Sequence, residues 1–174
     1  MIRDILTYPN KLLRTKSKEV EKFDSELHTL LDDMYETMVA FEGVGLAAIQ
    51  IGIPLNVLII CIPDENSVQT PENSLEAINP RIIKKDGSLV FTEGCLSVPE
   101  VHEDIKRAQS VEVEYFDRHG VKHTMEAEEF LAVVWQHEMD HLEGHLFIEK
   151  LSIIKRKKFE KEWKKKLKED KNRK

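Results

Sequence analysis

The sequence predicts an α+β fold, in which antiparallel or mixed β-sheets surround a central helix, with further helices near both ends of the chain. Two observations support this class. Helical spacing of apolar residues occurs early and late in the chain. The middle of the chain holds short runs that are either rich in β-branched residues or apolar at every second position, as in strands. These strands do not follow helices in a regular βαβ order. We expect one domain, residues 1–174, that includes a basic C-terminal helix at about residues 152–170.

The first predicted helix starts after Asp24, because a short carboxylate can accept hydrogen bonds from the free N–H groups at a helix start. Its apolar residues recur three and four positions apart and therefore share one face, which we expect to pack on the core. They are Leu27, Leu30, Leu31, Met34 and Met38. Gly43 and Gly45 end this pattern.

The middle of the chain reads as strands and turns. Residues 56–62, "NVLIICI", form an apolar run that is typical of a buried strand, and we expect Cys61 in it to be a core residue. The polar segment 64–74 predicts a surface loop. Residues 76–85 and 110–127 are predicted strands, and the second range is divided by a turn at Asp117 to Gly120.

Two more helices follow. The first should run from about Ala127 to a stop at Gly144. The second begins near Ser152 and carries the basic tail. Its narrow apolar stripe predicts a helix docked on the body, and consists of Ile154, Phe159, Trp163 and Leu167.

Composition limits the possible roles. No apolar run approaches the length of a membrane span, and the charged N-terminus is not that of a signal peptide. Because Cys61 and Cys95 are the only cysteines, a disulfide framework is not expected, and a reducing cytoplasm is the natural compartment. Residues 155–174 hold twelve Lys and Arg against four Asp and Glu, so the net charge of −6 combines a basic tail with an acidic body. An acidic body argues against a broad nucleic-acid-binding face.

The chemistry is indicated by "QHEMDHLEGHLF", residues 136–147. His137 and His141 are four positions apart and so share one helix face, where both imidazoles can bind one ion. Glu138 lies about 100° around the helix, where it can act on a water at the metal without binding the ion itself. The alternative is a pair of surface histidines on an amphipathic helix. An apolar helix around the motif favours the metal site.

Three positions could supply the third ligand. A downstream histidine in the metzincin pattern is excluded, because Phe147 holds that position and His145 is out of register. Glu160 and Glu162 are possible by distance, but acidic residues between lysines usually form solvated pairs. Cys95 in "EGCLS" is the upstream option, where a metal would hold a thiolate. Its alternatives are a buried structural cysteine and a nucleophile paired with histidine.

Three segments together resemble the peptide deformylases. They are "GVGLAAIQ" (43–50), "EGCLS" (93–97) and "QHEMDHLEG" (136–144), in the order and spacing of that family. Weaker similarity in "YPNKLLR", "INPR" and "EKLSIIK" extends the resemblance over most of the chain. The absence of long insertions is similar to the shorter bacterial subclass. Two regions depart from the family pattern: the loop 64–76, and the acidic segment 98–107, where relatives often carry an arginine near His102.

The resemblance implies that the chain removes the formyl group from N-formylmethionine at the start of nascent polypeptides. It implies one divalent ion, Fe²⁺ in the cell and replaceable by Zn²⁺, Ni²⁺ or Co²⁺, bound by Cys95, His137 and His141. Glu138 would be the acid/base residue. Such a cytoplasmic enzyme would act during translation.

Further roles follow from the same resemblance. Gln50 and the backbone N–H of Leu96 would face the oxyanion, and Val44, Gly45 and Gly94 would bind the substrate. Because Gly43 and Gly45 lack Cβ, an extended peptide could approach their backbone closely and add as a strand. Alternatively, both glycines merely end the preceding helix.

Other functions and partners stay open at this point. A zincin-type peptidase shares the helix motif but needs a downstream ligand, and a non-catalytic ribosome-associated protein would not need the metal residues. The basic tail could contact the ribosome near the exit of the nascent chain, and a membrane surface is a weaker alternative. Otherwise we expect no DNA or membrane partner, and a monomer.

Overall fold

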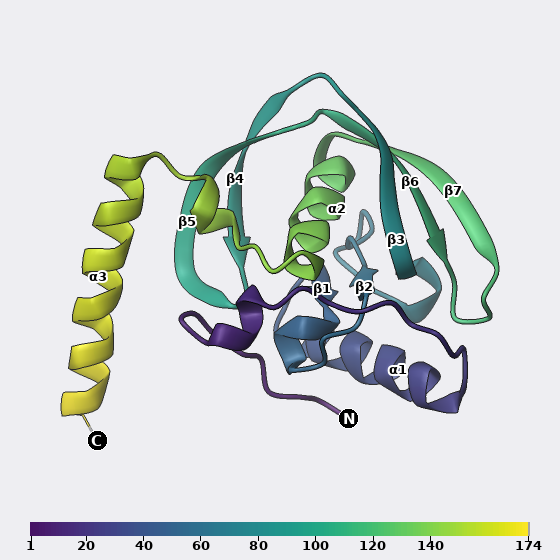
Figure 1. The fold of residues 1–174 in the computed structure, drawn as a ribbon, viewed down its shortest axis with the longest axis horizontal. Coiled ribbons are helices and arrows are strands. Elements are labelled where there is room, and N and C mark those ends of the chain that lie inside the picture. Colours follow the sequence, from purple (N-terminus) through teal and green to yellow (C-terminus); the bar gives the residue numbers. More distant parts are fainter. Residues whose placement is uncertain (174) are drawn as a thin grey trace.

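The computed structural model describes residues 1–173, in which strands wrap around a central helix (Figure 1). The helices are α1 (Ser25–Ala40), α2 (Glu129–Leu142) and α3 (Ile153–Asn172). The strands are β1 (Gly45–Ala47), β2 (Val57–Ile60), β3 (Leu75–Asp86), β4 (Leu89–Cys95), β5 (Val98–Arg107), β6 (Ser110–Phe116) and β7 (Lys122–Glu128). They form an antiparallel sheet in the order β1-β2-β3-β6-β7 and a separate hairpin of β4 and β5. The predicted α+β class is confirmed, with every strand pair antiparallel.

Helix α1 begins as predicted. The carboxylate of Asp24 accepts a hydrogen bond from the Leu27 N–H at 3.1 Å. The apolar face packs with β1 and β2 in one core cluster, where Leu31, Met34 and Met38 are fully buried. After the helix ends, the Gly43 N–H still donates to the Met38 carbonyl at 2.9 Å, which turns the chain toward β1.

The five-stranded sheet has β1 at one edge. Gly45 of β1 pairs with Ile60 of β2, so the other side of β1 has no strand beside it within the sheet. Strand β2 is buried throughout, and the following Cys61 is fully buried as predicted. The segment between β2 and β3 is the predicted loop, with one short 3-10 turn at Pro71–Asn73.

Helix α2 lies inside the molecule and contacts β1, β2, β6 and β7 (Figure 1). Its predicted start at Ala127 is wrong by two residues, because the pairing of β7 with β6 continues to Glu128, opposite Ser110. The predicted stop at Gly144 is confirmed. Gly144 has φ +82°, and a Cβ there would lie 2.5 Å from the Arg14 carbonyl oxygen, so both conformation and space require glycine.

Strands β4 and β5 form the other wall around α2. Cys95 pairs with Val98, so only Leu96 and Ser97 make the turn between them. Val98 and Ile105 pack in a third core cluster with Leu146 and Phe147, which follow α2 in the chain. The hairpin therefore brings Cys95 beside the end of α2.

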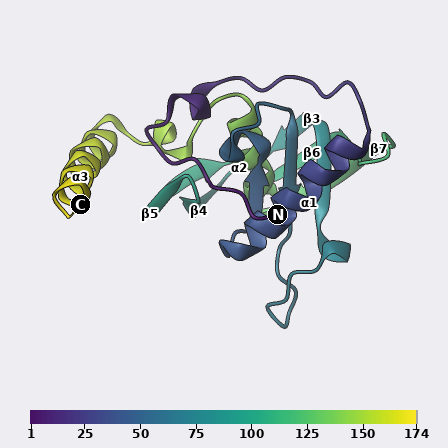
Figure 2. The same ribbon diagram turned by 90° about the horizontal axis from the view of Figure 1, so that it is seen from below.

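Helix α3 lies at one end of the molecule, beside β5 (Figures 1 and 2). Phe159 and Trp163 are buried and pack on Tyr8, with ring centroids 5.3 and 5.7 Å apart. The predicted stripe is wrong at Ile154, which is 83% exposed, because nine helical positions place it opposite Trp163. Leu167 is also exposed. No helix among residues 1–173 combines the length and apolar character of a membrane span.

Candidate metal centre and active site

Helix α2 presents two imidazoles from successive turns at its inner face. The Nε2 atoms of His137 and His141 lie 3.2 Å apart, and both side chains are buried. Burial, followed by the neighbouring His137, lowers the pKa of His141 well below its ordinary value, so this ring is neutral. A neutral imidazole nitrogen is the form that binds a metal.

Cys95 completes the group from the end of β4. Its Sγ lies 3.4 Å from His141 Nε2, and the three ligand atoms lie within 4.8 Å of one another. A soft sulfur and two imidazole nitrogens that converge in this way fit a divalent transition metal ion. Among residues 1–173 this is the one such group, and neither Glu160 nor Glu162 belongs to it.

The orientation of His137 is set by residues that sequence reasoning did not identify. Glu93 on β4 lies 2.9 Å from His137 Nδ1, so the proton on this nitrogen points to the carboxylate and Nε2 faces the other ligands. Arg107 on β5 donates two hydrogen bonds of 2.8 Å to Glu93 and one of 2.6 Å to Asp140 on α2. Burial alone would raise the pKa of Glu93, but the contacts with Arg107 and His137 lower it to about 2.

Phe147 explains why no downstream histidine could complete the site. Its side chain is 1% exposed, and its ring stacks against His137 with centroids 6.1 Å apart. His145 is exposed and lies 3.1 Å from Glu149. The position that holds the third histidine in metzincins is thus occupied here by a phenylalanine that packs against the ligand His137.

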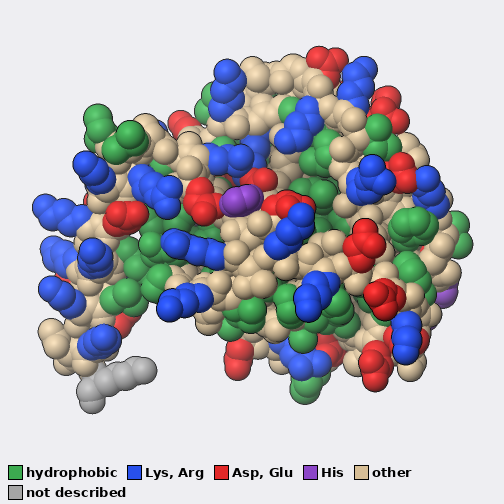
Figure 3. Space-filling model, in the orientation of Figure 1, with side chains coloured by type: hydrophobic (Ala, Val, Ile, Leu, Met, Phe, Trp, Pro, Cys, Tyr) green, Lys and Arg blue, Asp and Glu red, His purple; other side chains and the backbone are tan. Residues whose placement is uncertain are grey.

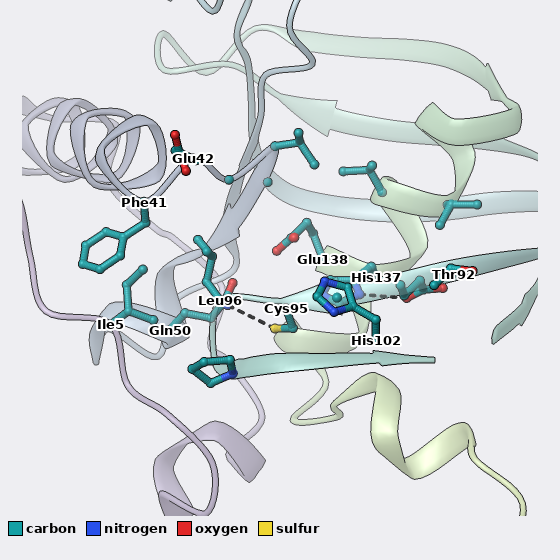
Figure 4. Close-up of a pocket in the computed structure, with 18 of the residues that line it drawn as sticks. Ile5, Phe41, Glu42, Gln50, Thr92, Cys95, Leu96, His102, His137 and Glu138 are labelled. Atoms are coloured by element: carbon teal, nitrogen blue, oxygen red, sulfur yellow. Dashed lines mark hydrogen bonds and ion pairs between the residues drawn. The ribbon is translucent and has the colours of Figure 1, made fainter. Parts of the chain in front are cut away.

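Glu138 points from α2 into the cleft in front of the ligand group (Figure 4). The side chain is buried, and within residues 1–173 its Oε2 has no hydrogen-bond partner. Burial raises the pKa of Glu138 to about 7. A cation held by the three ligands would draw this value down. A buried carboxylate that points into the space in front of the ligand group is suited to exchange protons with a water there.

Gln50 comes from the 3-10 turn Ala48–Ile51, and its amide points at the sulfur (Figure 4). Its Nε2 lies 3.6 Å from Cys95 Sγ and donates to Ser97 Oγ at 3.1 Å. Its Oε1 accepts from the Ala47 N–H at 2.9 Å, which fixes the direction of the amide. Leu96 follows Cys95 in the hairpin turn.

The ligand group lies beside a cleft of about 850 Å³. Of the predicted site residues, all but His141 line this cleft: Val44, Gly45, Gln50, Gly94, Cys95, Leu96, His137 and Glu138. One wall is apolar, with Phe91 and Phe130 at a centroid distance of 5.2 Å beside Val133 and Val134. Sequence reasoning missed this wall, although the apolar residues before His137 were a usable signal.

The glycines in the motifs make room for specific side chains. A Cβ at Gly45 would lie 2.7 Å from Glu138 Oε1, and one at Gly43 would lie 2.8 Å from Leu96 Cδ1. A Cβ at Gly94 would lie 2.8 Å from the ring of His102, which reaches over the cleft from β5 (Figure 4). Close packing inside the site therefore accounts for all three, in addition to any approach of a substrate.

Comparisons with known proteins identify the family of the chain. The family model described as "Polypeptide deformylase" matches residues 2–157. Peptide deformylases from Campylobacter jejuni and Nautilia profundicola are 58% and 56% identical over 172 and 168 residues, covering 98% and 97% of both chains.

Solved structures are similar over the same length. A peptide deformylase from Legionella pneumophila superposes with a TM-score of 0.89 at 40% identity, covering 100% of this chain and 99% of that one. One from Ehrlichia chaffeensis, solved in complex with actinonin, gives 0.86 at 39% identity, covering 95% and 97%. With the metal-ligand group and its cleft in place, these matches over nearly the whole length show that the chain belongs to the polypeptide deformylase family.

Proposed function

We propose that this chain is a metal-dependent hydrolase that removes the formyl group from N-formylmethionine at the start of nascent polypeptides and releases formate. One observation carries the proposal: the ligand atoms of Cys95, His137 and His141 converge beside an apolar cleft into which the Glu138 carboxylate points. The family is metal-dependent, and these three residues would hold the ion. When bound, a divalent ion supplies the Lewis acidity that makes water a nucleophile near neutral pH.

Sulfur and imidazole ligands suit several metals, so the choice of ion rests on the family. We propose Fe²⁺ in the cell, with Zn²⁺, Ni²⁺ or Co²⁺ able to replace it. Metal analysis of protein purified without oxygen tests this point. Iron in near-stoichiometric amount supports it, and zinc alone under those conditions contradicts it.

Glu138 would move the proton. Its Oε2, which has no hydrogen-bond partner among residues 1–173, can accept a proton from the attacking water and then deliver it to the departing amine of methionine. This transfer separates formate from the new free amine and returns Glu138 to its starting charge.

Gln50 and the N–H of Leu96 would stabilise the oxyanion. The Gln50 amide is held by Ala47 on one side and presents Nε2 to the sulfur side of the site. A donor fixed before the reaction does not need to reorganise as charge develops, and removing one such donor typically costs about 10²–10³ in rate.

The substrate would occupy the cleft with its methionine side chain against Phe91, Phe130 and Val133. Val44 and Gly45 lie at the edge of the sheet, where an extended peptide could add as a strand. Gly94 lines the opposite side of the cleft, on β4.

Formate release from formyl-Met-Ala-Ser tests the function directly. The Glu138→Ala variant should keep its metal and lose turnover, because the ligands are intact and the proton carrier is absent. Near-normal turnover in this variant would contradict the role of Glu138. An internally quenched peptide without a formyl group tests the peptidase alternative, and we expect no cleavage, since Phe147 fills the downstream ligand position.

We also propose that α3 contacts the ribosome in the cytoplasm, and that the enzyme is a monomer. Lysines cover the outer side of α3 (Figure 3), while Phe159 and Trp163 attach the helix to the body. Reversing the charge of Lys161, Lys164 and Lys168 should weaken co-sedimentation with ribosomes at low salt and leave peptide turnover unchanged. Equal co-sedimentation of this variant and the wild type would rule out the contact.

A further inference from the structure

The loop between β2 and β3 reaches back to the substrate side of the molecule through one side chain. This loop extends from the body in Figure 2. The amide Nε2 of Gln69 donates two hydrogen bonds, to the Gly43 carbonyl oxygen at 2.8 Å and to the Cys61 carbonyl oxygen at 2.6 Å. Both N–H groups of this amide are therefore used to join the end of β2 to the segment that leads into β1.

Gly43 belongs to the wall of the cleft that an extended peptide would meet. Gly43, Val44 and Gly45 all line the cleft. The Val44 carbonyl accepts from the Cys61 N–H at 2.9 Å, and Gly45 pairs with Ile60 in the sheet. Gly45 is thus held by the strand ladder, whereas the Gly43 carbonyl lies beyond the ladder and is held by Gln69.

Gln69 is itself held in place. Its own carbonyl accepts a hydrogen bond from the Tyr35 hydroxyl of α1 at 3.3 Å. Earlier in the loop, Asp64 Oδ1 accepts from the N–H groups of Asn66 and Val68 at 2.8 and 2.9 Å, which closes a compact turn before Gln69. These bonds hold the backbone of the loop at Gln69, and the two bonds of the amide hold its side chain against Gly43 and Cys61.

We propose that Gln69 is a positioning residue for peptide binding: it fixes the Gly43 end of the cleft wall so that the backbone of the substrate meets a preformed edge. This inference rests on the proposed function, in which the edge at Val44 and Gly45 binds the peptide. Gln69 does not line the cleft, and Gly45, which lies beside Glu138, is held by its own pairing with Ile60 in the sheet. Gln69 therefore acts on the affinity for the peptide and not on the chemical step.

The test compares Gln69→Leu, which keeps the approximate length and removes both donors, with Gln69→Glu, which sets a carboxylate against two carbonyl oxygens. For formyl-Met-Ala-Ser we expect KM to rise about tenfold in Gln69→Leu, and further in Gln69→Glu, with kcat within twofold of wild type. Gln109→Leu is the matched control, because it removes a glutamine amide bonded to Glu129 at 2.8 Å outside the cleft. Its KM should not change.

A second readout separates this inference from the proposed function. Calorimetric binding of the product peptide Met-Ala-Ser should weaken about tenfold in Gln69→Leu, and this measurement needs no turnover. Wild-type protein that releases no formate contradicts the proposed function alone. If KM and product affinity of both Gln69 variants stay within twofold of wild type, or if kcat falls while KM is unchanged, the positioning role is wrong. Should Gln69→Leu fail to fold, Gln69→Glu, which is isosteric, decides by the same criteria.

Discussion

Replacing Gly45 by alanine tests whether the space left by this glycine holds the proton carrier. The added Cβ would lie 2.7 Å from Glu138 Oε1 and 3.0 Å from its Cδ and Cγ, whereas ordinary contact begins at 3.4 Å. The carboxylate must therefore retreat by about 0.7 Å at its nearest oxygen. The backbone of Gly45 does not have a positive φ, so alanine is compatible with the strand itself.

The expected loss follows from the sensitivity of proton transfer to position. A misplacement of about 1 Å can cost about 10²-fold in rate, and general acid–base catalysis contributes typically about 10²–10⁴-fold. We expect kcat for formyl-Met-Ala-Ser to fall about 10²-fold in Gly45→Ala. Metal content should match wild type, because Cys95, His137 and His141 are untouched.

Two comparisons make the result decisive. Gly43→Ala also adds a Cβ, but it meets the end of a flexible leucine side chain, Leu96 Cδ1 at 2.8 Å, and should cost less in kcat. In a Glu138→Ala background, Gly45→Ala should not lower the residual rate of formate release any further, since the displaced carboxylate is already absent. A Gly45→Ala enzyme with kcat within threefold of wild type would refute the reasoning.

Three further predictions concern the metal, the buried charges and pH. Cys95→Ser should lower or change the bound metal, measured by elemental analysis, and full metal content with full activity would exclude Cys95 as a ligand. Arg107→Met should destabilise the fold by about 3–5 kcal/mol in urea unfolding, because it leaves the Glu93 carboxylate buried without its partner; a loss below about 1 kcal/mol would contradict this. The Met1 amine, 2.8 Å from Asp33, lowers the pKa of Asp33 below its ordinary 3.8 in the folded chain. The stability from this ionised carboxylate is therefore complete above pH 3.8 and lost as pH falls through the folded pKa, so Asp33→Asn should be less stable than wild type at neutral pH and lose that difference in acid. A difference independent of pH would contradict it.

Local patterns predicted α1 and the helix that carries the two histidines of the metal-binding motif. Asp24 and the apolar spacing after it were enough to place α1, because capping and periodicity act within a few residues. The spacing of His137 and His141 likewise predicted a shared helix face, and their Nε2 atoms do meet. From the sequence, Cys95 was one of several candidates for the third ligand. The hairpin turn of β4 and β5 places its sulfur beside His141.

Pairings between distant residues could not be read in this way. Glu93 stands in a recognised motif, yet its partner Arg107 is fourteen positions away on the next strand and resembles any basic residue in an acidic segment. The packing of Glu138 against Gly45 brings together residues that are 93 positions apart in the sequence. The start of α2 was misplaced because cross-strand pairing at Glu128 extended β7 beyond what helical periodicity suggests.

The charged network of Arg107, Glu93 and Asp140 connects the elements that carry the metal ligands. Arg107 on β5 binds Glu93 on β4 and Asp140 on α2, so one guanidinium ties the hairpin of Cys95 to the helix of the two histidines. These protein contacts, together with the close packing of Phe147 on His137, hold the elements that carry the ligand atoms. Removal of the metal by a chelator should therefore abolish turnover while costing less stability than Arg107→Met. The reverse order would mean that the ion, and not the charged network, assembles the site.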